Sequence, residues 1–98
     1  MDIKWENDIF TAALEGRIDS GNSGDVETEI RGAIGDRKPA SVVLDAGGLE
    51  YISSAGLRVI LKAQKAMSAK GGMKILHVNE TIMEIFEITG FSDILTIE

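Results

Sequence analysis

The order of apolar and polar residues in the first third of the chain predicts a hairpin followed by a helix. Two short segments, Ile3–Glu6 and Ile9–Glu15, are typical of strands, and the Asn7-Asp8 pair between them is a turn signal. A polar, glycine-rich loop follows at Ile18–Gly24. In Asp25–Ile34 the apolar residues recur at helical spacing with acidic residues between them, which predicts an amphipathic helix.

The second half of the chain continues as alternating strands and helices. Ser41–Asp45 has the composition of a buried strand, and a long helix is predicted at about Ser54–Lys70. Its apolar stripe lies opposite three basic residues, and Gly71-Gly72 is a strong stop signal. The remaining predicted elements are a strand at Met73–Val78, a helix capped by Asn79 and ending at Gly90, and a short strand at Ile94–Ile97.

This order predicts one α/β domain that spans residues 1–98. The opening hairpin contributes an antiparallel strand, and the later alternation implies a mixed, mostly parallel sheet with helices packed on it. In such sheets the loops at the carboxyl ends of the strands bind ligands and partners. Asp19-Ser20 follows the second strand and Ser53-Ser54 follows the third, so we expect both pairs at this edge.

The composition argues against several classes of function. The net charge is −6, and residues 1–50 hold 11 acidic and 5 basic residues, which disfavours nucleic-acid binding. The chain has no cysteine and a single histidine, His77, so we expect no metal site and no cofactor.

The chain shows neither a signal peptide nor an apolar run long enough for a membrane span, so we expect a cytoplasmic protein without a membrane partner. Nothing in the sequence calls for more than a monomer.

The small residues at the start of the long helix are the main functional signal. Ser53, Ser54, Ala55 and Gly56 leave the backbone N–H groups of the first turn unshielded, so another molecule could approach closely. One interpretation is that Ser54 is a simple N-cap. The other is that Ser54 accepts a phosphate, which the helix dipole would stabilise and which would disrupt a close partner contact.

An enzymatic interpretation has little support in the sequence. A nucleophilic serine needs a base, and His77 lies in a predicted apolar strand, where a structural role is expected. The G-x-S-x-G motif and the glycine-rich phosphate-binding loops are absent. We therefore predict no catalytic residues. The basic residues Arg58, Lys62 and Lys65 are either a solvated helix face or a docking site for an acidic partner.

Three segments resemble the STAS domains of bacterial anti-sigma factor antagonists. The most specific is VVLDAGGLEYISSAGLRVIL, residues 42–61. KGGMKILHVNETIMEIFEITGF (residues 70–91) is similar to that family's next strand and helix, and LEGRIDSGNSGDVETEI (residues 14–30) is similar to its second strand and first helix. The resemblance covers nearly the whole chain and implies a single STAS domain.

The resemblance also implies a non-enzymatic regulator that acts by partner switching. In this family, the unphosphorylated antagonist binds an anti-sigma factor that is also a serine kinase of the histidine-kinase-like ATPase class. A sigma factor is thereby released. The kinase then phosphorylates the antagonist on a serine at the start of the second helix, which ends binding, and a PP2C-type serine phosphatase restores it.

Alignment with the family's motif places the phosphorylated serine at Ser54. The implied partner contacts are Asp19, Ser20, Ser53, Ala55, Gly56, Leu57 and Arg58. Many members have aspartate before the phosphoacceptor, whereas this chain has Ser53, which is therefore the alternative acceptor. The departure also leaves open a constitutive STAS scaffold or signalling module without a phosphorylation cycle. A small-ligand-binding or catalytic role at the same edge is a third possibility.

Overall fold

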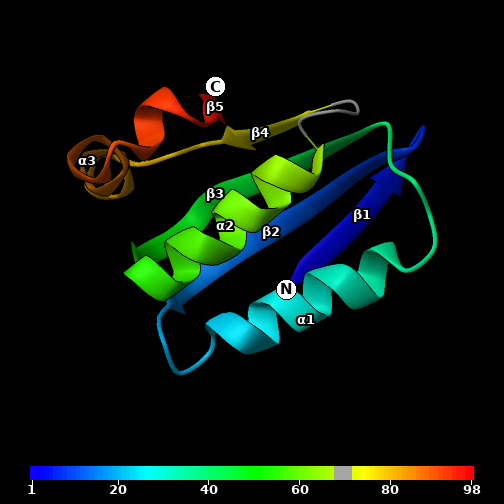
Figure 1. The fold of residues 1–98 in the computed structure, drawn as a ribbon, viewed down its shortest axis with the longest axis horizontal. Coiled ribbons are helices and arrows are strands. Elements are labelled where there is room, and N and C mark those ends of the chain that lie inside the picture. Colours follow the sequence, from blue (N-terminus) through cyan, green and yellow to red (C-terminus); the bar gives the residue numbers. More distant parts are fainter. Residues whose placement is uncertain (68–71) are drawn as a thin grey trace.

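The computed structural model describes residues 1–67 and 72–98 as one sheet with helices packed against it (Figure 1). Within these residues, five strands lie side by side in the order β1-β2-β3-β4-β5. Strand β1 is antiparallel to β2 and every other neighbouring pair is parallel, as predicted. The elements are β1 Asp2–Glu6, β2 Ile9–Ile18, α1 Ser23–Ile34, β3 Ser41–Ile52, α2 Ser54–Met67, β4 Met73–Leu76, α3 Glu80–Thr89, the 3-10 turn η1 Phe91–Asp93, and β5 Thr96–Ile97.

The core lies between the sheet and the helices, because alternate strand residues face α1 and α2. Phe10 of β2 pairs with Val42 of β3, which pairs with Met73 of β4, and all three are buried. Figure 1 shows α1 and α2 covering the same face of the sheet. The fully buried Ile82 and Phe86 hold α3 against this core.

The predicted turns and caps are confirmed where the local chemistry specifies them. Asn7 and Asp8 have φ values of 49° and 66°, the left-handed pair that a tight β-hairpin requires. The Asn79 side chain accepts a hydrogen bond of 2.9 Å from the backbone N–H of Ile82, and Gly90 ends α3 with φ 81°. The predicted end of the long helix at Lys70, with its stop at Gly71, lies outside the described residues.

Strand β3 is much longer than the sequence suggested. It runs to Ile52 instead of ending at Asp45, because the chain does not turn at Gly47-Gly48. A register shift lies between Asp45 and Gly48, where β3 has one residue more than β2. Strand β2 likewise continues past Glu15 to Ile18, with register shifts on the way. These extensions carry both strands to the edge where the candidate site lies.

Other predicted boundaries also differ from the structure. Helix α1 begins at Ser23, two residues before the predicted start at Asp25. The final strand contains only Thr96–Ile97, because the chain first forms η1 after Gly90. These differences reflect local hydrogen bonding and do not change the topology.

Candidate functional site

The ends of β2 and β3 bring the two predicted loops together. Ile18 is paired with Ile52 at the end of the parallel ladder, and the N–H of Ser53 donates a 2.8 Å hydrogen bond to the carbonyl of Ile18. Asp19 and Ser20 follow β2 at this point, and α2 starts one residue after Ser53. The sheet edge that the sequence indicated is therefore one continuous surface.

Ser53, and not Ser54, is the N-cap of α2. The backbone N–H of Gly56 donates to Ser53 Oγ at 3.3 Å, and the N–H of Leu57 donates to the Ser53 carbonyl at 2.9 Å. Ser54 is the first residue of the helix, and its side chain is exposed. Among the described residues nothing hydrogen-bonds to the Ser54 hydroxyl, so the interpretation of Ser54 as a cap is wrong.

Gly56 serves the packing of α2 against the strand ends. A Cβ atom at this position would lie 2.7 Å from Cγ1 of Ile52 and 2.8 Å from Cγ2 of Ile18, closer than real side chains approach. Gly56 is buried, so its small size admits these side chains and not an external molecule. Leu57 is also buried, with 4% of its surface exposed. Gly56 and Leu57 are therefore too buried to form a contact surface for a partner.

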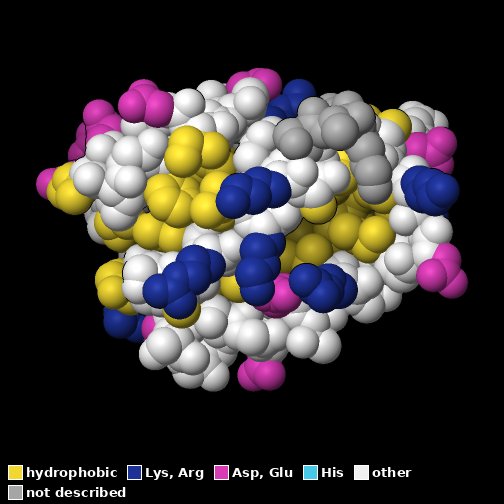
Figure 2. All heavy atoms as spheres, in the orientation of Figure 1, with side chains coloured by type: hydrophobic (Ala, Val, Ile, Leu, Met, Phe, Trp, Pro, Cys, Tyr) yellow, Lys and Arg dark blue, Asp and Glu magenta, His cyan; other side chains and the backbone are white. Residues whose placement is uncertain are grey.

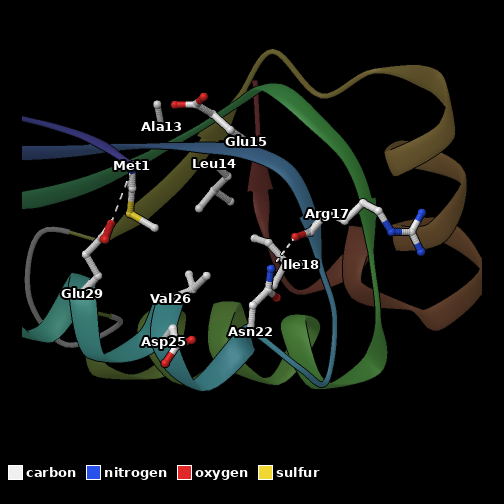
Figure 3. Close-up of a pocket in the computed structure, with 10 residues that line it drawn as sticks. All are labelled: Met1, Ala13, Leu14, Glu15, Arg17, Ile18, Asn22, Asp25, Val26 and Glu29. Atoms are coloured by element: carbon white, nitrogen blue, oxygen red, sulfur yellow. Dashed lines mark hydrogen bonds and ion pairs between the residues drawn. The ribbon is translucent and has the colours of Figure 1, made fainter.

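The loop before α1 is fixed by its own side chains. The Asp19 carboxylate accepts a 2.9 Å hydrogen bond from the N–H of Gly21. The Asn22 amide accepts from the N–H of Asp19 at 2.8 Å and donates to the Arg17 carbonyl at 2.7 Å. Figure 3 shows this link beside a cavity of about 190 Å³, with the Arg17 guanidinium pointing away from the cavity. Asp19 and Ser20 are thus held at a defined position.

Two residues near this edge escaped the sequence analysis. Arg17 and Tyr51 are cross-strand partners, and the guanidinium lies 4.4 Å from the centre of the tyrosine ring. Both stand on the opposite face from the buried Ile18 and Ile52, because side chains alternate along a strand. Only the register of the extended strands brings them together.

His77 occupies a different environment from the one predicted. Strand β4 ends at Leu76, and His77 follows it, exposed and with a left-handed φ of 60°. Its Nδ1 lies 2.9 Å from Oδ1 of Asp45. This hydrogen bond, together with one from the N–H of Gly47, lowers the pKa of Asp45 below its ordinary value. Among the described residues no hydrogen bond joins His77 to Ser54.

The charged residues of α2, the helix that begins at Ser54, are all basic. Helix α2 carries Arg58, Lys62 and Lys65 but no acidic residue, although the whole chain has a net charge of −6. Arg58 is exposed and lies one helical turn after Ser54. An anion on Ser54 would therefore meet the positive end of the helix dipole and a nearby guanidinium.

No group of three His, Cys, Asp or Glu side chains within 1–67 and 72–98 is placed to hold a metal ion. Over the same residues, none of the helices has the length and apolar character needed to cross a bilayer.

Comparison with known proteins identifies the family. The STAS domain family model matches residues 1–98. BtrV of Bordetella bronchiseptica, named as a candidate anti-sigma factor antagonist, is 38% identical over 90 residues, which are 91% of this chain and 77% of BtrV.

Solved structures confirm the fold. A candidate anti-sigma factor antagonist from Thermotoga maritima has a TM-score of 0.88 at 20% identity, covering 98% of this chain and 83% of that one. The unphosphorylated form of the anti-sigma factor antagonist SpoIIAA has a TM-score of 0.80 at 16% identity, with coverage of 99% and 86%. The phosphorylated form of SpoIIAA from Bacillus has a TM-score of 0.72 at 16% identity, with coverage of 99% and 89%. The chain belongs to the STAS domain family and is a relative of its anti-sigma factor antagonists.

Proposed function

We propose that the protein is an anti-sigma factor antagonist that switches partners by phosphorylation of Ser54. The observation that carries this proposal is that two adjacent serines have different roles. Ser53 caps α2, whereas the exposed Ser54 hydroxyl makes no hydrogen bond with the described residues. The kinship with anti-sigma factor antagonists, one of which has been solved with and without phosphate, supports the same conclusion.

The departure at Ser53 fits this proposal. Many members of the family have aspartate there, and serine and aspartate are both good N-cap residues. Ser53 keeps the cap through its Oγ, so the exchange preserves the helix start while removing a negative charge beside Ser54. We therefore propose Ser54 as the phosphoacceptor in preference to Ser53.

The proposed switch acts through charge at a closely packed contact. The partner would be an anti-sigma factor with serine kinase activity, and it would cover Ser54, the neighbouring Ala55 and Arg58, and the loop at Asp19-Ser20. Phosphate adds about −1.5 to −2 charges at pH 7. Inside a desolvated interface that charge is costly, so phosphorylation would release the partner. A PP2C-type serine phosphatase would restore binding by removing the phosphate.

Phosphate mapping tests the modification. The purified chain is incubated with ATP and its cognate anti-sigma kinase, and the product is digested and analysed by mass spectrometry. We expect phosphate on Ser54 in the native chain and in the Ser53→Ala variant, and none in Ser54→Ala. Modification of neither serine would rule out the switch.

Binding measurements test the consequence of the added charge. Ser54→Asp should weaken binding to the anti-sigma factor by at least about tenfold, because it places a charge in the contact. Ser54→Ala should bind like the native chain. Thr96→Asp is a matched control, since Thr96 is exposed in β5 and pairs with Lys74 near the start of β4, so it receives the same charge away from the ends of β2 and β3. Equal affinity of the two Ser54 variants would instead favour a constitutive STAS module.

A further inference from the structure

A groove of about 150 Å³ runs between α1 and α2, on the face of the molecule seen in Figure 2. The picture shows apolar side chains in a hollow between the two helices, with lysine and arginine side chains along its border. The floor comes from β3. The residues that line the groove are Glu27, Ile30, Arg31, Ile34, Val42, Leu44, Val59, Lys62, Ala63, Ala66 and Met67.

The packing of α1 leaves this groove incompletely filled. Of the apolar residues in α1, Ile30 is buried, whereas Val26, Ala33 and Ile34 are only partly buried. Ala66 of α2 lines the groove and is exposed. The groove can therefore accept an apolar side chain from outside without displacing the core.

The rim carries a positive charge that the protein only partly neutralises. Glu27 pairs with Arg31 at 3.1 Å and with Lys62 at 3.3 Å, so one carboxylate serves two cations. Arg58 is not among the lining residues, but it extends the basic rim by one turn of α2 before Lys62 and has no ion pair among the described residues. Like charges four residues apart on a helix are destabilising, which makes this row costly for the isolated protein.

We propose that this groove and its basic rim bind an acidic amphipathic helix of a partner protein. Apolar side chains of the partner helix fill the hollow between α1 and α2, and its carboxylates pair with Arg58, Lys62 and Arg31. This is helix-in-groove recognition, with charge complementarity setting the orientation. The surface shares Arg58 with the proposed switch contact but otherwise lies farther along α2, and its occupation does not require phosphorylation of Ser54, so it extends beyond the proposed switch.

A designed peptide provides the probe. It is an alanine-based helix of about four turns that carries leucine at positions i, i+4 and i+7, with glutamates on both sides of this stripe. The control peptide has glutamine at each glutamate. Binding to the unmodified full chain is followed by fluorescence anisotropy, and the contact surface is mapped by NMR chemical-shift changes.

Three variants make the test specific. Ala66→Trp fills the exposed end of the groove. Arg58→Glu combined with Lys62→Glu reverses the rim. The matched control is Lys4→Glu combined with Lys74→Glu, which makes the same change in net charge on the sheet face away from α1 and α2, where both lysines lie in one cross-strand row through Thr11 and Val43. Thermal unfolding checks that each variant is folded.

We expect the glutamate peptide to bind at least about tenfold more tightly than the glutamine peptide at low salt, and the difference to shrink as salt screens the charges. Ala66→Trp and the rim reversal should each weaken binding by about tenfold or more, while the control pair should not. Equal binding of the two peptides, unchanged binding by Ala66→Trp, or shifts confined to another surface would overturn the proposal. Self-association of the native chain that the rim reversal abolishes would also overturn it, by assigning the groove to a second copy.

Discussion

At the scale of single residues, two neighbouring serines have different roles. Ser53 Oγ accepts a hydrogen bond from the first turn of α2, whereas the exposed Ser54 hydroxyl makes none with the described residues. The sequence alone left Ser54 as either a helix cap or a phosphoacceptor and gave Ser53 only as the alternative acceptor. The difference arises because the helix begins at Ser54, which fixes the cap one position earlier.

This assignment predicts different effects of the two alanine substitutions. Ser53→Ala should lower the free energy of unfolding by about 1 kcal/mol, because it removes the cap, and Ser53→Asp should retain most of the stability. Ser54→Ala should change the free energy of unfolding by less than about 0.5 kcal/mol. Urea unfolding at equilibrium measures all three. A larger loss in Ser54→Ala than in Ser53→Ala would contradict the assignment of the cap.

The pair Asp45–His77 predicts a dependence of stability on pH. Hydrogen bonds from His77 and from the N–H of Gly47 lower the pKa of Asp45 in the folded protein. The stabilisation is therefore complete above the unfolded pKa of about 3.9 and is lost as the pH falls through the lower folded pKa. We expect the stability advantage of the native chain over Asp45→Asn to shrink as the pH is lowered from about 5 to about 2.

A variant of the partner residue provides the control. His77→Asn should reduce the advantage conferred by Asp45, because it removes the ring nitrogen while asparagine still tolerates the left-handed backbone. Acid unfolding followed by circular dichroism gives the comparison. If the difference in stability between the native chain and Asp45→Asn stays constant over this pH range, the Asp45–His77 pair is not the source of the pH dependence.

At the scale of secondary-structure elements, the start of α2 depends on close packing against two strands. Ile18 and Ile52 end β2 and β3, and both contact the position where a side chain on Gly56 would stand. The glycine lowers the intrinsic helix propensity but lets α2 approach the sheet. The position of Ser54 at the edge follows from this approach.

Two glycine substitutions separate packing from propensity. Gly56→Ala should destabilise the protein by about 1–3 kcal/mol, because the added methyl group overlaps two buried side chains. Gly32→Ala, in the last turn of α1 where nothing lies within 4 Å of an added Cβ atom, should stabilise it by about 0.5 kcal/mol. Chemical denaturation of both variants checks this contrast, and a stabilising Gly56→Ala would show that α2 does not need the close approach.

At the scale of the whole molecule, the helices are held to the sheet unequally. Helix α2 buries five residues and α3 buries the fully enclosed Ile82 and Phe86, whereas α1 buries only Ser23 and Ile30. Local opening is easiest where few apolar contacts must be broken. Helix α1, which buries the fewest apolar residues, also forms one wall of the proposed docking groove.

Hydrogen exchange should reveal this difference. We expect the backbone amides of α1 to exchange faster than those in the middle of α2 and α3, and the amides of β2 and β3 to exchange most slowly. Exchange measured by mass spectrometry or NMR on the free chain provides the rates. Protection of α1 equal to that of α2 would mean that the seam between them is tighter than its burial indicates.

The sequence by itself determined the order of the elements, the mixed, mostly parallel sheet and the location of the candidate site at one edge of it. Hydrophobic periodicity, turn residues and caps act over a few neighbouring positions, so the Asn7-Asp8 hairpin, the Asn79 cap and the alternation of strands and helices could be derived from the residues alone. The parallel sheet then required the ends of β2 and β3 to meet. The resemblance to STAS domains rested on the same local segments.

Only the tertiary structure decided what depends on distant parts of the chain. The register shift between Asp45 and Gly48, the pairing of Asp45 with His77, and the contact of Arg17 with Tyr51 each depend on the register between separate strands, which no local pattern specifies. The burial of Gly56, and hence the exposure of Ser54 beside a capping Ser53, likewise depends on how closely α2 approaches the sheet. Local periodicity thus set the elements, and packing between them set the chemistry available at their ends.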